Sequence, residues 1–118
     1  MPGYLAKQAE LKAKDVAEVI VFCVNDAAVM QAWAKDCGVD GSMITFYADT
    51  RTEFTKALGL EITHAGVMGV LGNVRCKRFS MLVDDGKVKV INIAAAEDDP
   101  AGDNAPEVSF VEKLLGDM

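Results

Sequence analysis

Residues 16–24, Val-Ala-Glu-Val-Ile-Val-Phe-Cys-Val, are the feature that most limits which fold this chain can adopt. The run is nearly continuous in β-branched and apolar residues, which is typical of a strand buried on both faces in a parallel sheet. It ends at Asn25-Asp26, and either residue can cap the start of a helix. Because parallel strands need a crossover connection between them, the run predicts the first strand of a strand–helix–strand unit.

The next segments are expected to complete that unit. Residues 27–37 have apolar side chains at helical spacing and are predicted to form a helix that ends at Gly38. Trp33 is expected in the core or on the packing surface of this helix. Residues 43–48 predict a second strand, and residues 52–58 predict a short helix.

The remaining segments predict local elements at both ends of the chain. A helix is expected before the apolar run, and a β-hairpin is expected later because Asp84-Asp85-Gly86 supplies the positive φ values of a tight turn. In the second hairpin strand, Val88, Val90 and Ile91 are expected to point inward. The predicted boundaries are a helix at 4–14, an irregular loop at 61–73, strands at 78–83 and 87–93, an acidic loop at 94–106 and a helix at 106–115.

Composition indicates a single, acidic globular domain. Its 118 residues are 51% hydrophobic, which is enough for one domain with its own core and too apolar for disorder. With 12 Lys+Arg against 18 Asp+Glu, the net charge is −6, which argues against nucleic acid as the main partner. No apolar run approaches the roughly 18 residues of a membrane-spanning helix.

The cysteines predict neither a disulfide framework nor a metal centre. Cys23, Cys37 and Cys76 are an odd number at wide spacing, without a CxxC pair and without a histidine at ligand distance. The sequence therefore predicts no metal and no cofactor. Free cysteines fit a reducing, intracellular compartment, and the N-terminus lacks the basic and apolar stretches of a secretory signal.

Three stretches together carry a family resemblance. They are Pro2-Gly3-Tyr4, residues 24–33 with Val-Asn-Asp-Ala and Met-Gln-Ala-Trp, and residues 77–89 with Lys-Arg-Phe-Ser-Met followed by Asp-Gly-Lys-Val-Lys. The chain resembles the peroxiredoxin-5 group, also called type II or atypical two-cysteine peroxiredoxins, over almost its whole length. The resemblance implies a single thioredoxin-like (redoxin) domain over residues 1–118 and thiol-dependent reduction of hydrogen peroxide and alkyl hydroperoxides.

The sequence departs from this family at its start. The family motif is P-x-x-x-T-x-x-C-S-x-x-H-x-P-G-Y, and only its last three residues are present, directly after Met1. The attacking cysteine, its threonine and the early strands are therefore missing from these residues. We expect the C-terminal portion of the fold, inactive alone, without the central strand that belongs between residues 18–24 and 78–83. Those two strands are not expected to pair with each other.

The resemblance assigns Arg78 to the family arginine that supports the attacking thiolate. A guanidinium suits this role because it is always charged and its planar fork can hold both peroxide oxygens. Cys76 is a redox candidate because Arg75, Lys77 and Arg78 surround it in sequence, which predicts an electropositive setting. Cys23 is the second candidate, two residues from the position where plant-like members carry a second cysteine. A structural role is the alternative for both cysteines, and His64 is expected to be an ordinary surface residue.

Three functions remain open from the sequence. A peroxidase would use thioredoxin, glutaredoxin or glutathione as reductant, as the resemblance implies, and could form a homodimer to which the helix of Trp33 contributes. A non-catalytic subunit or interaction module would have its exposed sheet edge covered by another polypeptide in a larger assembly. A stand-alone redox sensor would use Cys76.

Overall fold

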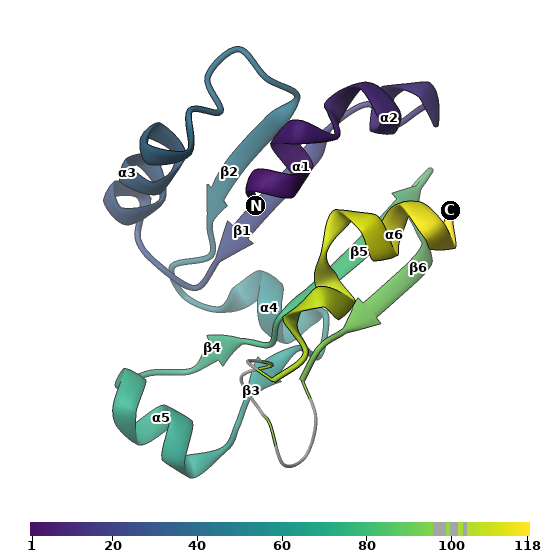
Figure 1. Cartoon of the computed structure of the whole chain (residues 1–118). Coiled ribbons are helices and arrows are strands. Elements are labelled where there is room, and N and C mark those ends of the chain that lie inside the picture. Colours follow the sequence, from purple (N-terminus) through teal and green to yellow (C-terminus); the bar gives the residue numbers. More distant parts are fainter. Residues whose placement is uncertain (96–98, 100–101, 103) are drawn as a thin grey trace.

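The computed structural model describes residues 1–95, 99, 102 and 104–118. Helices and strands alternate through most of the chain, and the strands form three separate two-stranded sheets (Figure 1). The elements, in order, are α1 (Pro2–Ala6), α2 (Gln8–Ala13), β1 (Val19–Cys23), α3 (Ala27–Cys37), β2 (Ile44–Ala48), α4 (Glu53–Ala57), β3 (Glu61–Ile62), α5 (Ala65–Leu71), β4 (Arg75–Cys76), β5 (Phe79–Asp84), β6 (Lys87–Ile93), the 3-10 helix η1 (Pro106–Ser109) and α6 (Val111–Asp117).

The predicted strand–helix–strand unit is confirmed. Strands β1 and β2 are parallel, with α3 as the crossover between them. The Asp26 carboxylate accepts the backbone N–H of Val29 at 2.8 Å and so caps α3. Gly38 ends the helix in the left-handed conformation, with φ of 67°.

The predicted hairpin is also confirmed. Strands β5 and β6 are antiparallel, and Asp85 and Gly86 both have positive φ, as a tight hairpin turn requires. The predicted inward side of β6 is wrong at two positions, because Val88 and Ile91 are exposed whereas Val90 is half-buried. A register shift between Leu82 and Val83 interrupts the regular alternation of the two faces.

Strands β1 and β5 do not pair with each other. Among the described residues β1 pairs with β2 alone and β5 pairs with β6 alone, as the sequence predicted. Aromatic side chains bridge the two sheets: the ring of Phe22 in β1 lies 5.7 Å from that of Phe79 in β5 and 4.8 Å from that of Phe54 in α4. Burial of β1 on both faces is not observed, because Ile20 is 58% exposed on a face that the described residues leave uncovered.

Two regions differ from the predicted elements. The expected helix at 4–14 is two helices that meet at Lys7, and it starts at Pro2 because proline fits the first turn of a helix. The expected loop at 61–73 contains β3 and α5 and leads to β4. Strand β3 pairs antiparallel with β4, and the exposed His64 caps α5 by accepting the N–H of Val67 at 3.4 Å.

The C-terminal segment packs back on the N-terminal helix. The predicted helix at 106–115 is η1 followed by α6, and the hydroxyl of Tyr4 in α1 donates to the carbonyl of Ser109 at 2.9 Å. Val111, 1% exposed, belongs to the core together with Leu11 of α2. Residues 97 and 98 of the expected acidic loop lie outside the described residues. In the described part of the chain, no helix has the length and apolar character needed to cross a membrane.

Candidate functional site

Arg78 lies between β4 and β5, and the end of β6 fixes its backbone. Its carbonyl accepts the N–H of Ala94 at 2.9 Å, and its side chain is exposed. Burial lowers the pKa of the Met1 α-amino group; the Cys37 thiol opposes this, and the positive charge of Arg78 lowers the pKa further. The guanidinium therefore lies near Met1, the residue that precedes Pro2-Gly3-Tyr4 in α1.

Gly102 is a positioning residue for Arg78 that the sequence analysis missed. It is buried with φ of 75°, and a Cβ built there would lie 3.1 Å from the Cβ of Arg78 and 3.3 Å from that of Ala94. Only glycine combines this backbone conformation with such a close approach. The one signal in the sequence was a glycine inside an otherwise acidic loop.

The other two candidates, Cys23 and Cys76, lie around a buried polar pair. Cys23 ends β1, and its carbonyl accepts the N–H of Asp49 at 2.9 Å. The Asp49 carboxylate accepts the hydroxyl of Thr55 at 2.6 Å and its N–H at 2.8 Å, so that it holds the start of α4. The thiol of Cys76, in β4, donates to the carbonyl of Lys77 at 3.2 Å and also interacts with Thr55. The structure thus brings both cysteines to one cluster and leaves Arg78 outside it.

The environment of Cys76 is not the electropositive one predicted from its neighbours in sequence. Burial, with contributions from Cys23 and Asp49, raises the pKa of the Cys76 thiol to about 11, although a hydrogen bond from Thr55 lowers it in part. Residues adjacent in a strand point to opposite faces, so basic neighbours in sequence need not approach the sulfur. The guanidinium of Arg75 instead donates to the carbonyl of Val24.

This raised pKa predicts slow alkylation of Cys76. Because only the thiolate reacts, iodoacetamide should modify Cys76 about 100-fold more slowly at pH 8 than it modifies an unstructured cysteine peptide. The rate should still rise about tenfold per pH unit between pH 7 and 9. Peptide-resolved mass spectrometry measures both rates in one mixture. A rate at Cys76 that levels off below pH 9 would contradict the assignment.

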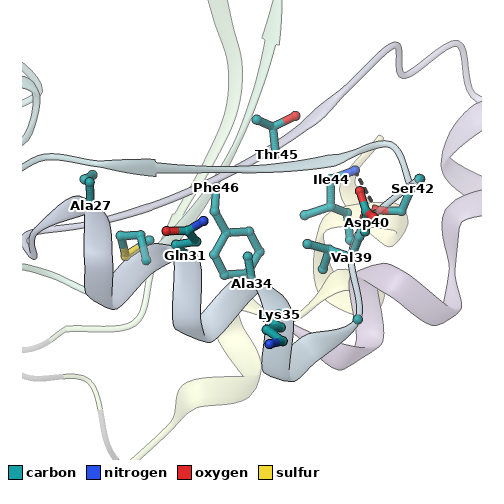
Figure 2. A pocket seen from close by; sticks show the side chains of 14 residues that line it. Ala27, Gln31, Ala34, Lys35, Val39, Asp40, Ser42, Ile44, Thr45 and Phe46 are labelled. Atoms are coloured by element: carbon teal, nitrogen blue, oxygen red, sulfur yellow. Dashed lines mark hydrogen bonds between the residues drawn. The ribbon is translucent and has the colours of Figure 1, made fainter.

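A groove lies between α3 and β2, away from these residues (Figure 2). Figure 2 shows the Phe46 ring directed toward α3, between Gln31 and Ala34. The Trp33 ring packs edge-on against Phe46 with centroids 4.8 Å apart, which confirms its predicted packing role. None of Arg78, Cys23 and Cys76 lines the groove. In the described part of the chain, no cluster of three or more His, Cys, Asp or Glu side chains is arranged to hold a metal ion.

Comparison with known proteins identifies the family. A family profile described as Redoxin matches residues 1–114. Over 93 residues the chain is 40% identical to "Peroxiredoxin-2E-2, chloroplastic" of Oryza sativa subsp. japonica and 43% identical to "Peroxiredoxin-2B" of Arabidopsis thaliana, covering 79% of this chain in each case. These matches span 41% and 55% of the two relatives, so the chain spans about half of their length.

The solved structures agree with the sequence comparison. Reduced Prx3 from Vibrio vulnificus in complex with H2O2 superposes with a TM-score of 0.81 at 37% identity, over 99% of this chain and 68% of that protein. Oxidised Prx3 from the same organism gives a TM-score of 0.80 at 36% identity, over 100% of this chain and 67% of that one. These neighbours confirm the thioredoxin-like α/β fold and the resemblance on which it was expected. The chain therefore belongs to the redoxin family, among the peroxiredoxins.

Proposed function

We propose that this chain is the part of a thiol-dependent peroxidase that carries the supporting arginine, Arg78, and that residues outside these 118 supply the attacking thiol. The observation that carries the proposal is the missing pairing between β1 and β5. In the family arrangement the central strand lies between β1 and β5. Within the described residues neither strand has a partner on that side. Support also comes from Arg78, which lies close enough to Met1, the residue before Pro2-Gly3-Tyr4, to act on its α-amino group electrostatically.

The chemistry follows from the thiolate and the guanidinium. The thiolate attacks one oxygen of a hydroperoxide, the S–O bond forms, the O–O bond breaks, and the leaving oxygen takes a proton to give water or an alcohol. Arg78 would stabilise the thiolate before attack and the negative charge on the leaving oxygen during it. Hydrogen peroxide is the first substrate to test, because the related Prx3 was solved in complex with it. A dithiol or glutathione-type reductant would regenerate the thiol.

The test is to complete the chain. The N-terminal segment of Vibrio vulnificus Prx3, up to the residue that aligns with Met1 of this chain, is fused ahead of Pro2. We expect the fused protein to consume hydrogen peroxide with a thiol reductant, and the 118-residue chain alone to show no consumption above buffer. A fusion whose attacking cysteine is changed to serine is the matched control. A fusion that folds cooperatively without consuming peroxide, or that does not fold, contradicts the proposal.

The same open edges support one alternative function, that of a non-catalytic subunit. Unpaired strand edges bind other polypeptides by strand addition, and exposed Ile20 on β1 and Val83 on β5 would add apolar contact area. In that case the chain would purify with a partner and the complex would not consume peroxide. We also propose a reducing, intracellular compartment, supported by the three free thiols of Cys23, Cys37 and Cys76.

A further inference from the structure

We propose that Cys23 and Cys76 form a dithiol that closes into an intramolecular disulfide when a hydroperoxide oxidises it. The proposal concerns two thiols other than the attacking thiol of the peroxidase reaction. It therefore stands or falls separately from the proposed function and needs neither Arg78 nor a completed chain.

A direct contact holds the neighbours of the two cysteines together. The guanidinium of Arg75, the residue before Cys76, donates through Nη1 to the carbonyl of Val24, the residue after Cys23. This hydrogen bond connects residues 51 positions apart in sequence, and it ties the end of β1 to β4. Val24 is 1% exposed, so the acceptor of this hydrogen bond belongs to a buried residue of the core.

A second path runs through the buried pair of Asp49 and Thr55. Cys23 accepts the Asp49 N–H at 2.9 Å, and Asp49 accepts the Thr55 hydroxyl at 2.6 Å. Thr55 is fully buried. From Thr55 the connection continues to Leu60, whose N–H donates to the Thr55 carbonyl at 3.1 Å and whose own carbonyl accepts the N–H of Lys77 at 2.8 Å. The residues on both sides of Cys76 are therefore held in place, Arg75 against the end of β1 and Lys77 against Leu60 beside α4.

The side chain of Cys23 also acts electrostatically on the Cys76 thiol. Cys23 is one of the groups that raise the pKa of Cys76, an effect that requires the side chains to be close. Both residues are half-buried, so a small oxidant can reach them, and both are free thiols. Cys37, the third free thiol, closes α3 and forms none of these connections.

The reaction balances with a hydroperoxide as the only oxidant. Cys23 reacts first, because the Cys76 thiol is held protonated near neutral pH. The Cys23 thiolate takes one oxygen from the hydroperoxide to give a sulfenic acid, and the alcohol or water leaves. Cys76 then attacks the Cys23 sulfur as its thiolate, and the S–O bond breaks. The proton released by the Cys76 thiol joins the departing hydroxide, which leaves as water with the disulfide formed. Two thiols lose two electrons, and the O–O bond gains them.

The experiment treats the 118-residue chain with excess hydrogen peroxide, blocks the remaining thiols with N-ethylmaleimide and digests the protein without reduction. We expect one blocked cysteine, Cys37, and a peptide pair cross-linked through Cys23 and Cys76. A disulfide usually requires Cα atoms within about 7 Å, so the cross-link reports their approach directly. Blocked Cys23 and Cys76, or a cross-link that involves Cys37, would overturn the proposal.

Variants test which cysteine is oxidised first and whether Cys37 takes part. In Cys76→Ser the resolving thiol is gone, so dimedone should label Cys23 as sulfenic acid after the same treatment. In Cys37→Ser, the matched control, the yield of the cross-link should equal that of the unchanged chain within a factor of two. Dimedone labelling of Cys76 in a Cys23→Ser chain, at a rate equal to that of Cys23, would overturn the order of attack.

Discussion

Replacing Arg78 with alanine should lower the rate of peroxide reduction by the completed chain about 10²- to 10³-fold. This is the typical cost of removing one donor that stabilises charge developing in a transition state. The loss should fall on kcat/KM for hydrogen peroxide, because the guanidinium acts on the thiolate and on the leaving oxygen. Stopped-flow measurement of peroxide consumption under single-turnover conditions gives this rate constant directly.

Two further substitutions make the Arg78 prediction specific. Arg78→Lys keeps the positive charge but loses the planar fork, so its rate should lie between those of the unchanged and alanine proteins. Lys77→Ala removes a neighbouring cation that the proposal leaves without a role, and its rate should stay within a factor of two. If Lys77→Ala and Arg78→Ala lowered the rate equally, the effect would come from positive charge in the region and not from a specific role of Arg78. An unchanged rate in Arg78→Ala would show that Arg78 has no role in the reaction.

Replacing Asp49 with alanine should destabilise the fold by about 2–4 kcal/mol. The Asp49 carboxylate accepts hydrogen bonds from the N–H groups of Phe54 and Thr55 and from the Thr55 hydroxyl. Alanine leaves these donors without their acceptor, and each buried unpaired group costs about 1–3 kcal/mol. Asp49→Asn keeps a carbonyl oxygen that can accept some of these hydrogen bonds, so its free energy of unfolding should fall by less. Urea unfolding followed by circular dichroism measures both.

The Asp49 carboxylate also makes the stability of the folded chain depend on pH. Burial raises the pKa of Asp49, but the hydrogen bonds from Thr55 and Phe54 outweigh it and lower the pKa overall. A carboxyl whose pKa is lower in the folded state contributes its stability above the unfolded pKa of about 3.9 and loses it as the pH falls through the folded value. The stability difference between the unchanged chain and Asp49→Asn should therefore shrink below about pH 4. A difference that stays constant from pH 7 to pH 3 would contradict this.

The sequence predicted the elements whose signals are local. Asp26 and Gly38 bound α3 because a cap and a left-handed glycine act through the backbone beside them. Asp85-Gly86 closes the hairpin for the same reason. The segment 61–73 was misjudged because α5 buries none of its residues, so it leaves no apolar periodicity to detect, and because Gly66 and Gly69 lower its helix propensity.

The site was predictable only where a motif marked it. Arg78 was found because it lies in an Arg-Phe-Ser stretch that resembles the family, and the structure leaves its role as a proposal. The chemical setting of Cys76 could not be judged from the charges of Arg75 and Lys77, because burial and groups distant in sequence, those of Thr55, Cys23 and Asp49, set the pKa of its thiol. Gly102 was missed because its close approach to Arg78 depends on the path of a loop, for which one sequence carries no pattern.

The separation of β1 from β5 has a thermodynamic consequence. Within the described residues β1 and β5 each have one strand partner, so water can reach the peptide groups on their other edges, as it can reach the exposed side chain of Ile20. A strand that entered between them would release this water and bury apolar area, which makes the heat capacity of association negative. Completion of the sheet would therefore gain much of its driving force near room temperature from solvent entropy, and would weaken in the cold.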